Sequence, residues 1–207
     1  LNYLKILGWQ GLVEGPTSSL YRVGPLARLN AAKGMATPIA DAEYEEMFEV
    51  LGKPAHHTLA YHWARLIEAL QAAETMQRIA EDPILTSKDI RNMNLRLTKK
   101  GIGCIEAARG TLIHHYETDD NGLMTKANLI VATQHNSAPI CLSVKKAAQG
   151  FIKGGEKREG LLNMVEMAFR AYDPCLGCAT HTLPGKTPLK INIRDHEGNI
   201  VETIVRD

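Results

Sequence analysis

The sequence lacks the features that mark several large classes of protein. No apolar run approaches the roughly 20 residues of a membrane-spanning helix, and one of the longest, from Ala127 to Thr133, is far shorter. The formal net charge is only +1, so no broad electrostatic field favours nucleic acid or an anionic membrane. We therefore expect neither a membrane span nor a nucleic-acid partner.

Cysteine is scarce and unevenly placed. The 207 residues contain four cysteines, and two of them, Cys175 and Cys178, form a Cys-x-x-Cys pair. Four cysteines in a chain of this length make no disulfide framework, so the pattern fits a reducing compartment and a metal or redox role. Cys104 and Cys141 are isolated in apolar runs, and we predict that both are core residues.

An initiating methionine, internal repeats and low-complexity tracts are also missing. Because the chain starts at Leu1, we expect a fragment or one half of a split subunit. This start does not exclude an upstream targeting segment. The length allows one sizeable core.

The distribution of glycine, proline and apolar residues predicts mainly helices. Glycines and prolines interrupt residues 1–38, which predicts loops with short elements. A helix is expected from Asp41 to Leu51, and apolar residues at helical spacing predict a long amphipathic helix over about residues 57–80. Two further helices are expected over residues 143–152 and 161–172.

Strands are predicted in two places. Residues 102–105, 111–117 and 124–133 read as strands, and Asp-Asp-Asn-Gly at 119–122 is a hairpin signal. Alternation over 189–193 and 200–205 predicts a C-terminal β-hairpin, which must pack on something because an isolated hairpin is marginal in water. We predict an α+β fold: mainly a helical bundle around the long helix, a small antiparallel sheet (about 102–133) packed against it, and the hairpin.

The chemistry concentrates in residues 173–181, which read Asp-Pro-Cys-x-x-Cys-x-x-His. Two cysteines three positions apart, in a turn, can direct both sulfurs at one soft metal such as zinc, copper(I), nickel or an iron–sulfur cluster. A structural zinc site needs a second pair, which the chain lacks. A thioredoxin-like pair opens a helix after a strand, whereas this pair follows a predicted helix.

Two further segments have plainer interpretations when each is taken alone. Residues 101–110 read as a glycine-flexed strand in which Glu106 and Arg109 are surface charges. Residues 127–136 read as a buried strand followed by a polar turn. A zinc-binding structural module therefore remains an alternative.

Taken together and in this order, the three segments resemble the C-terminal half of the nickel–iron hydrogenase large subunit. The cysteine motif is highly specific to that family, and residues 106–110 match its Glu-Ala-Pro-Arg-Gly motif with Ala108 in place of proline. Residues 22–30 match a recurring upstream segment. Residues 126–133 and 172–175 are most similar to the deazaflavin-nonreducing (viologen-reducing) group. The family's first cysteine pair is absent here.

The resemblance implies roles for the residues around the cysteines. Cys175 would be a terminal nickel ligand and Cys178 would bridge nickel and iron, with cyanide and carbon monoxide on the iron. Arg109 would lie over the open metal positions and would be held there by Asp173. Because a guanidinium is permanently charged, it could polarise dihydrogen beside the metals. The Thr133 hydroxyl would donate a hydrogen bond to a cyanide ligand.

The resemblance also implies a third metal and a maturation step. His181 and the Leu129 carbonyl would bind magnesium or iron near the C-terminus of the mature chain. Residues 1–181 would belong to the large subunit, and residues 182–207 would be an extension that an endopeptidase removes by cutting between His181 and Thr182.

The implied activity is reversible heterolytic cleavage of dihydrogen in the cytoplasm, in methanogenic metabolism. Electrons would pass to an iron–sulfur small subunit, and the other implied partners are the N-terminal half of the large subunit and heterodisulfide reductase. The chain alone is expected to be inactive. A related scaffold subunit of electron-transfer complexes, which has lost the cysteines, is a further alternative.

Overall fold

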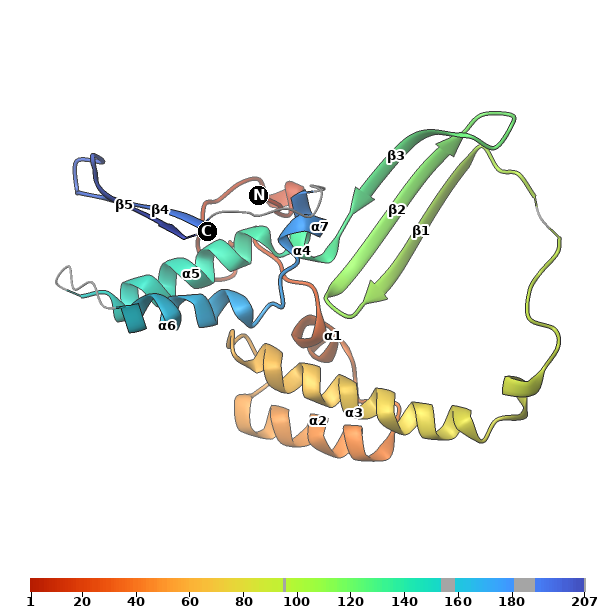
Figure 1. Cartoon of the computed structure of the whole chain (residues 1–207). Helices are drawn as coiled ribbons and strands as arrows, with labels where there is room; N and C mark the ends of the chain where they lie inside the picture. The colour runs from red at the N-terminus through yellow and green to blue at the C-terminus, as the bar shows by residue number, and fades with distance from the viewer. Residues whose placement is uncertain (95, 154–158, 181–188, 207) are drawn as a thin grey trace.

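The computed structural model has the predicted α+β fold, and it describes residues 1–94, 96–153, 159–180 and 189–206 (Figure 1). Short 3-10 helices, η1 (Lys5–Leu7) and η2 (Pro83–Thr86), lie in the N-terminal segment and after the long helix. Within the described residues, no helix is both long enough and apolar enough to cross a membrane.

Three helices form the first layer: α1 (Pro25–Ala31), α2 (Pro38–Leu51) and α3 (Ala60–Ala80). The buried residues of α3 are Ala60, Tyr61, Ala64 and Ile67. This face is only in part the one that the apolar spacing indicates, because Leu59 and Leu66 are 53% and 69% exposed. The helix starts three residues later than predicted.

Helix α2 starts three residues earlier than predicted. Pro38 occupies its first turn, where a missing N–H costs nothing. The carboxylate of Glu74 on α3 accepts hydrogen bonds from the backbone N–H groups of Ile39 and Ala40 at 3.1 and 3.0 Å. A distant side chain therefore caps this helix, although Thr37 followed by Pro38 is also a local signal for a helix start.

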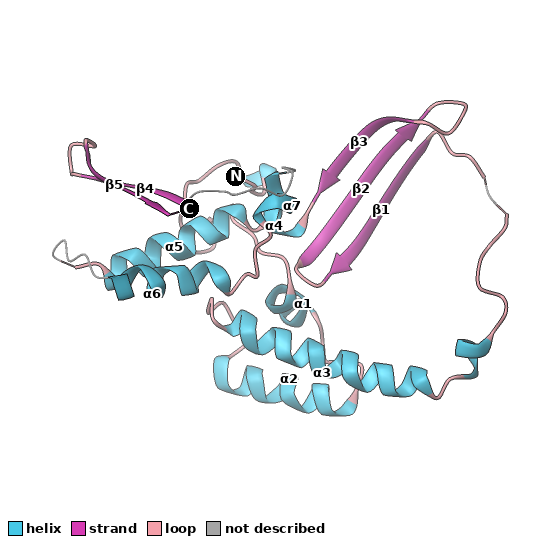
Figure 2. Ribbon diagram, in the orientation of Figure 1, coloured by secondary structure: helices cyan, strands magenta, loops and turns pink. Residues whose placement is uncertain are grey.

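The predicted sheet consists of β1 (Lys100–Ala107), β2 (Gly110–Thr118) and β3 (Met124–Ile130), all antiparallel. Asp119 closes the β2–β3 turn by accepting hydrogen bonds from two backbone N–H groups, as the hairpin signal predicts. Only the end of the sheet with the β1–β2 turn lies beside the helices (Figure 2), and all but the last residue of β1 is exposed. The predicted packing of the sheet against α3 is therefore wrong.

The prediction that Cys104 and Cys141 are core residues is also wrong, because both are exposed. Cys104 lies on β1 between Ile102 and Ile105, which are 66% and 64% exposed. Apolar neighbours indicate that a surface can be buried, but they do not show that another part of the same chain covers it.

The third predicted strand is shorter than expected. β3 ends at Ile130, and α4 (Ala132–His135) follows, so Thr133 lies on a helix and not on a strand. The side-chain amide oxygen of Gln134 accepts a hydrogen bond from the backbone N–H of Val131 at 3.3 Å. This cap turns the chain out of the sheet.

The remaining helices and the C-terminal strands complete the fold. Helix α5 (Ser137–Phe151) starts six residues before its predicted boundary and packs against α6 (Glu159–Arg170) (Figure 1). The C-terminal hairpin pairs β4 (Leu189–Arg194) with β5 (Ile200–Arg206), as predicted. Its apolar side chains at positions 200, 201 and 205 are more than half exposed, so the expected packing is not found there.

Candidate metal centre

The two cysteines of the motif lie at the start of a short helix, where a turn was expected. Helix α7 spans Leu176–Thr180, so Cys175 directly precedes it and Cys178 lies within it. The two Cα atoms are 5.3 Å apart and the structure joins the sulfurs in a disulfide. A metal held by both side chains requires the thiolates, so the metal-binding form is the reduced pair.

Hydrogen bonds hold Cys175 from two sides. Its sulfur accepts a hydrogen bond from the backbone N–H of Cys178 at 3.4 Å. Its own N–H donates to the hydroxyl oxygen of Thr133 on α4 at 3.0 Å. Thr133 is buried, and accepting this bond leaves its O–H free to donate elsewhere. Helices α4 and α7 are thereby joined at the cysteine pair.

Arg109 is placed next to the motif by the β1–β2 turn. Ala107 pairs with Gly110, so Ala108 and Arg109 form a two-residue turn at the tip. The Arg109 Nε is 2.8 Å from the backbone oxygen of Asp173 and 3.0 Å from its carboxylate. The pair expected from the resemblance is therefore present in the structure, two residues before Cys175.

Asp173 has a left-handed backbone conformation with a φ of 50°. Outside glycine this conformation is uncommon, although aspartate tolerates it better than most residues. The bond from Arg109 to the Asp173 carbonyl and the bond from the Asp173 N–H to the carbonyl of Arg170 at 2.9 Å both fix this residue. The chain thereby enters α7 at a defined angle.

A tight backbone contact anchors the Arg109 turn. Gly24 and Gly110 have φ values of 108° and 134°, and a Cβ on Gly24 would lie 2.8 Å from the carbonyl oxygen of Arg109. The Asn136 side chain, at the end of α4, accepts from the N–H of Val23 at 2.9 Å and donates to its carbonyl at 3.1 Å. Glycine is required here because the two backbones meet.

Tyr172 anchors the other side of the motif. It is buried, its ring lies 4.7 Å from that of Tyr61 on α3, and its hydroxyl is 2.9 Å from the hydroxyl of Ser143. Neither Tyr172 nor Asn136 stood out in the sequence as a site residue, although both lie in the segments that carry the resemblance. What marks these two residues is that their side chains are buried, and their burial is known only once the fold is known.

Other predicted site residues are less informative. Leu129 lies on β3 opposite His114 and is half-buried. His181 and Thr182 fall outside the described residues, so their predicted roles have no structural counterpart here. In the described ranges no group of three or more histidine, cysteine or carboxylate side chains could hold a metal ion. The donor set therefore fits half of a soft, thiolate-rich site.

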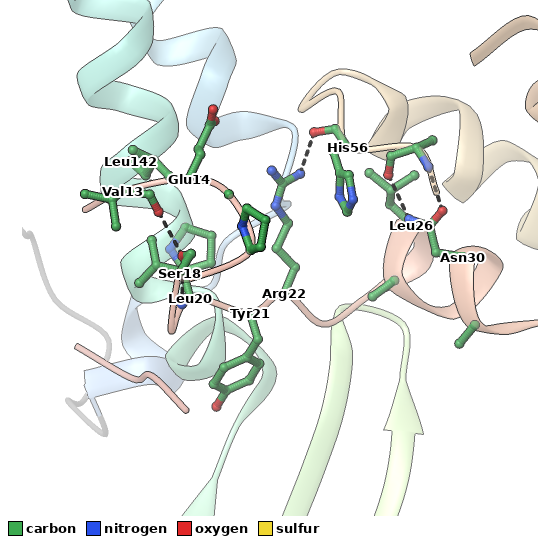
Figure 3. Close-up of a pocket in the computed structure, with 16 residues that line it drawn as sticks. Val13, Glu14, Ser18, Leu20, Tyr21, Arg22, Leu26, Asn30, His56 and Leu142 are labelled. Carbon is green, nitrogen blue, oxygen red and sulfur yellow. Dashed lines mark hydrogen bonds between the residues drawn. The ribbon is translucent and has the colours of Figure 1, made fainter. Parts of the chain in front are cut away.

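A cleft of about 830 Å³ lies elsewhere, between the N-terminal segment, α1 and α5 (Figure 3). Its polar side chains include Arg22, whose guanidinium donates to the backbone oxygen of His56 at 2.9 Å. Neither cysteine of the motif, nor Arg109, lines it. The cleft is therefore separate from the cysteine pair.

Comparison with known proteins gives consistent matches. The family model described as nickel-dependent hydrogenase matches residues 17–181. An F420-non-reducing hydrogenase iron-sulfur subunit of Archaeoglobus profundus is 53% identical over 98% of this chain and 42% of its own length. The NAD-reducing hydrogenase HoxS subunit beta of Cupriavidus necator is 40% identical over 99% of this chain and 41% of its own length.

A solved structure shows the same fold. The crystal structure of an NAD+-reducing [NiFe]-hydrogenase in the H2-reduced state matches with a TM-score of 0.78 and 45% identity, over 86% of this chain and 38% of that one. The chain thus spans about two fifths of the length of these relatives, and the matched part is the C-terminal part of the large subunit. The chain belongs to the nickel-dependent hydrogenase family.

Proposed function

We propose that this chain forms part of the catalytic subunit of a nickel–iron hydrogenase, which cleaves dihydrogen heterolytically and reversibly. The observation that carries the proposal is the assembly of Cys175, Cys178, Thr133 and the Arg109–Asp173 pair from three separate segments. Membership of the family supports it. The nickel–iron centre, with cyanide and carbon monoxide on its iron, would supply the chemistry that polarises dihydrogen and accepts its electrons.

Each residue of this assembly has a task that its geometry supports. The two cysteines would act as thiolates, Cys175 toward nickel and Cys178 toward both metals. Arg109 would keep a fixed positive charge beside them, oriented through its Nε by Asp173. Thr133 would use its O–H to bind a cyanide nitrogen while its oxygen holds the Cys175 N–H. His181 and the Leu129 carbonyl would hold the magnesium or iron of the mature chain.

The proposed partners are those that would complete a metal site of which this chain provides one cysteine pair. Two further thiolates would come from the N-terminal half of the large subunit, and this chain alone would then be inactive. Electrons would leave through an iron–sulfur small subunit, and heterodisulfide reductase would be the further partner in the cytoplasm. Relatives named F420-non-reducing hydrogenase support this subtype.

Metal analysis of the purified complete complex separates this function from its two alternatives. A hydrogenase contains nickel together with iron and takes up hydrogen with viologen as acceptor. A structural zinc module contains zinc, and a scaffold subunit contains neither metal. A complex that held zinc in place of nickel, or no metal at the cysteines, would contradict the proposal.

We also propose that residues 182–207 are removed during maturation. The exposed apolar side chains of the β4–β5 hairpin and its pairing with no third strand support a separable tail in the described part of the chain. While attached, the tail would keep the cysteines accessible for nickel delivery, and cleavage after His181 would let the site close. Intact mass spectrometry of the active enzyme is the test, and an active subunit that still ended at Asp207 would exclude the idea.

A further inference from the structure

The guanidinium of Arg28, on α1, has each of its five N–H groups engaged. Its Nε and Nη2 form two parallel hydrogen bonds to the carboxylate of Glu68 on α3, at 2.6 and 2.5 Å. Its Nη1 donates to the Glu106 carboxylate at 3.0 Å. A planar fork held at both edges has very little freedom to reorient.

The two remaining bonds reach the turn that carries Arg109. Nη1 donates to the carbonyl of Ala107 at 2.9 Å, and Nη2 donates to the carbonyl of Ala108 at 3.0 Å. These residues directly precede Arg109, and the bonds tie the tip of the β1–β2 hairpin to α1 and α3. Since the rest of β1 is exposed, this attachment and the Gly24–Gly110 contact determine where the tip lies.

We propose that Arg28 is a positioning residue for Arg109. Arg28 fixes the turn carbonyls, and the fixed turn directs the Arg109 side chain toward Asp173, beside Cys175. The expected effect on turnover rests on the proposed function, whereas the positioning of the Arg109 turn by Arg28 does not. The side chains of Arg28 and Glu68 are each 23% exposed, so their paired bonds are only partly screened by water.

Lysine cannot replace Arg28 in this arrangement. An ammonium group offers three donors from a single point, whereas the five acceptor atoms here are arranged around the edges of one planar group. Arg28→Lys keeps the charge opposite Glu68 and Glu106 and protects the fold, while Arg28→Gln removes the charge as well. The matched control is Arg78→Gln, at the exposed end of α3.

The first test is hydrogen–deuterium exchange on the complete hydrogenase. Arg28→Lys and Arg28→Gln are expected to speed exchange of the backbone amides of residues 106–112 by about 10-fold or more, because the turn loses its attachment. Arg78→Gln should leave these amides unchanged. Unchanged exchange in both Arg28 variants would overturn the proposal, whatever the enzyme's activity.

The second test is a double-mutant cycle on hydrogen uptake. Arg28→Lys is expected to lower turnover about 10- to 100-fold at unchanged nickel and iron content, because small misplacements near a reacting centre are costly. In the Arg109→Lys background the same change should cost no more than about 2-fold, since Arg28 acts through Arg109. Fully additive losses would overturn the proposal. A wild-type complex without nickel or hydrogen uptake would instead overturn the proposed function, and the exchange test would still stand.

Discussion

At the scale of single residues, the positive charge beside the cysteine pair comes from Arg109. The orientation of its guanidinium depends on the contacts of one nitrogen, Nε. The Arg109 Nε contacts both the carbonyl and the carboxylate of Asp173. We expect Arg109→Lys in the complete enzyme to keep the metals but lose this fork. The loss of one such interaction at a reacting centre is worth about 2–4 kcal/mol, or roughly two to three decades in rate.

The measurement is hydrogen uptake normalised to nickel content. Lys100→Arg, an exposed change at the far end of β1, serves as the control and should retain wild-type turnover. An Arg109→Lys enzyme that turned over at the wild-type rate would place this residue outside the reacting centre.

His135 supplies a pH dependence of stability. Burial lowers its pKa, a nearby Glu106 opposes this weakly, and its Nδ1 is 2.7 Å from the Tyr21 hydroxyl. Because the folded pKa lies below the unfolded value of about 6.5, the unfolded chain binds more protons in the interval between them. The contribution to stability is therefore complete above about pH 6.5 and is lost as the pH falls toward the folded pKa.

We expect the unfolding free energy of the complete subunit to fall between about pH 7 and pH 5, and His135→Gln to flatten part of this slope. Urea unfolding at a series of pH values measures it. His57→Gln, at an exposed position, should leave the slope as in the wild type. Equal slopes in the wild type and in His135→Gln would show that His135 titrates alike in both states.

At the scale of elements, Asn136 joins the end of α4 to the segment before α1. Its side chain is 1% exposed and satisfies both the N–H and the carbonyl of Val23. Asn136→Ala would leave a buried N–H without a partner and remove a second bond, which costs about 2–4 kcal/mol in total. Tyr61 still donates to the Val23 carbonyl at 3.0 Å, which limits the loss.

The shift in the urea midpoint of the complete subunit checks this prediction. Asn121→Ala, at the exposed tip of the β2–β3 turn, is the matched control and should move the midpoint little. Similar midpoints for the two variants would mean that the Val23 contact contributes no net stability.

Element boundaries show what a sequence pattern can and cannot report. The long helix and the hairpin at Asp119 were predictable because apolar spacing and turn chemistry are local. The start of α2 was predicted three residues late although Thr37 and Pro38 mark it locally, whereas its capping by Glu74 on another helix has no local signal. The end of β3 was missed because apolar residues continue past it, and only the Gln134 cap marks the change to α4.

At the scale of the whole molecule, four distant segments contact one another around Arg109 and the cysteine pair: residues 22–24, 109–110, 133–136 and 173–178. The resemblance rested on motifs in all four segments and named Arg109, Asp173 and Thr133 as site residues. Their supports were not predictable, since Arg28 reads as an ordinary helical arginine until its acceptors are seen. A pattern identifies the reactive groups, whereas their positioning depends on long-range contacts.

The exposed surfaces agree with a chain that spans about two fifths of its relatives. Exposed apolar side chains lie on both faces of β1, Ile102 on one and Ile105 on the other, and the described residues hold only one cysteine pair near Arg109. Under the proposed function, the N-terminal half of the large subunit completes the metal site.

Nickel-edge X-ray absorption of the complete enzyme, in wild type and in Cys175→Ser and Cys178→Ser, shows whether the two cysteines bind the nickel. A serine hydroxyl is a hard, protonated ligand and cannot replace a thiolate on a soft metal. We expect a wild-type nickel environment dominated by sulfur, and in each variant a loss of sulfur ligation or of nickel itself, with hydrogen uptake abolished. A nickel spectrum that both serine variants left unchanged would contradict the assignment of Cys175 and Cys178 as metal ligands.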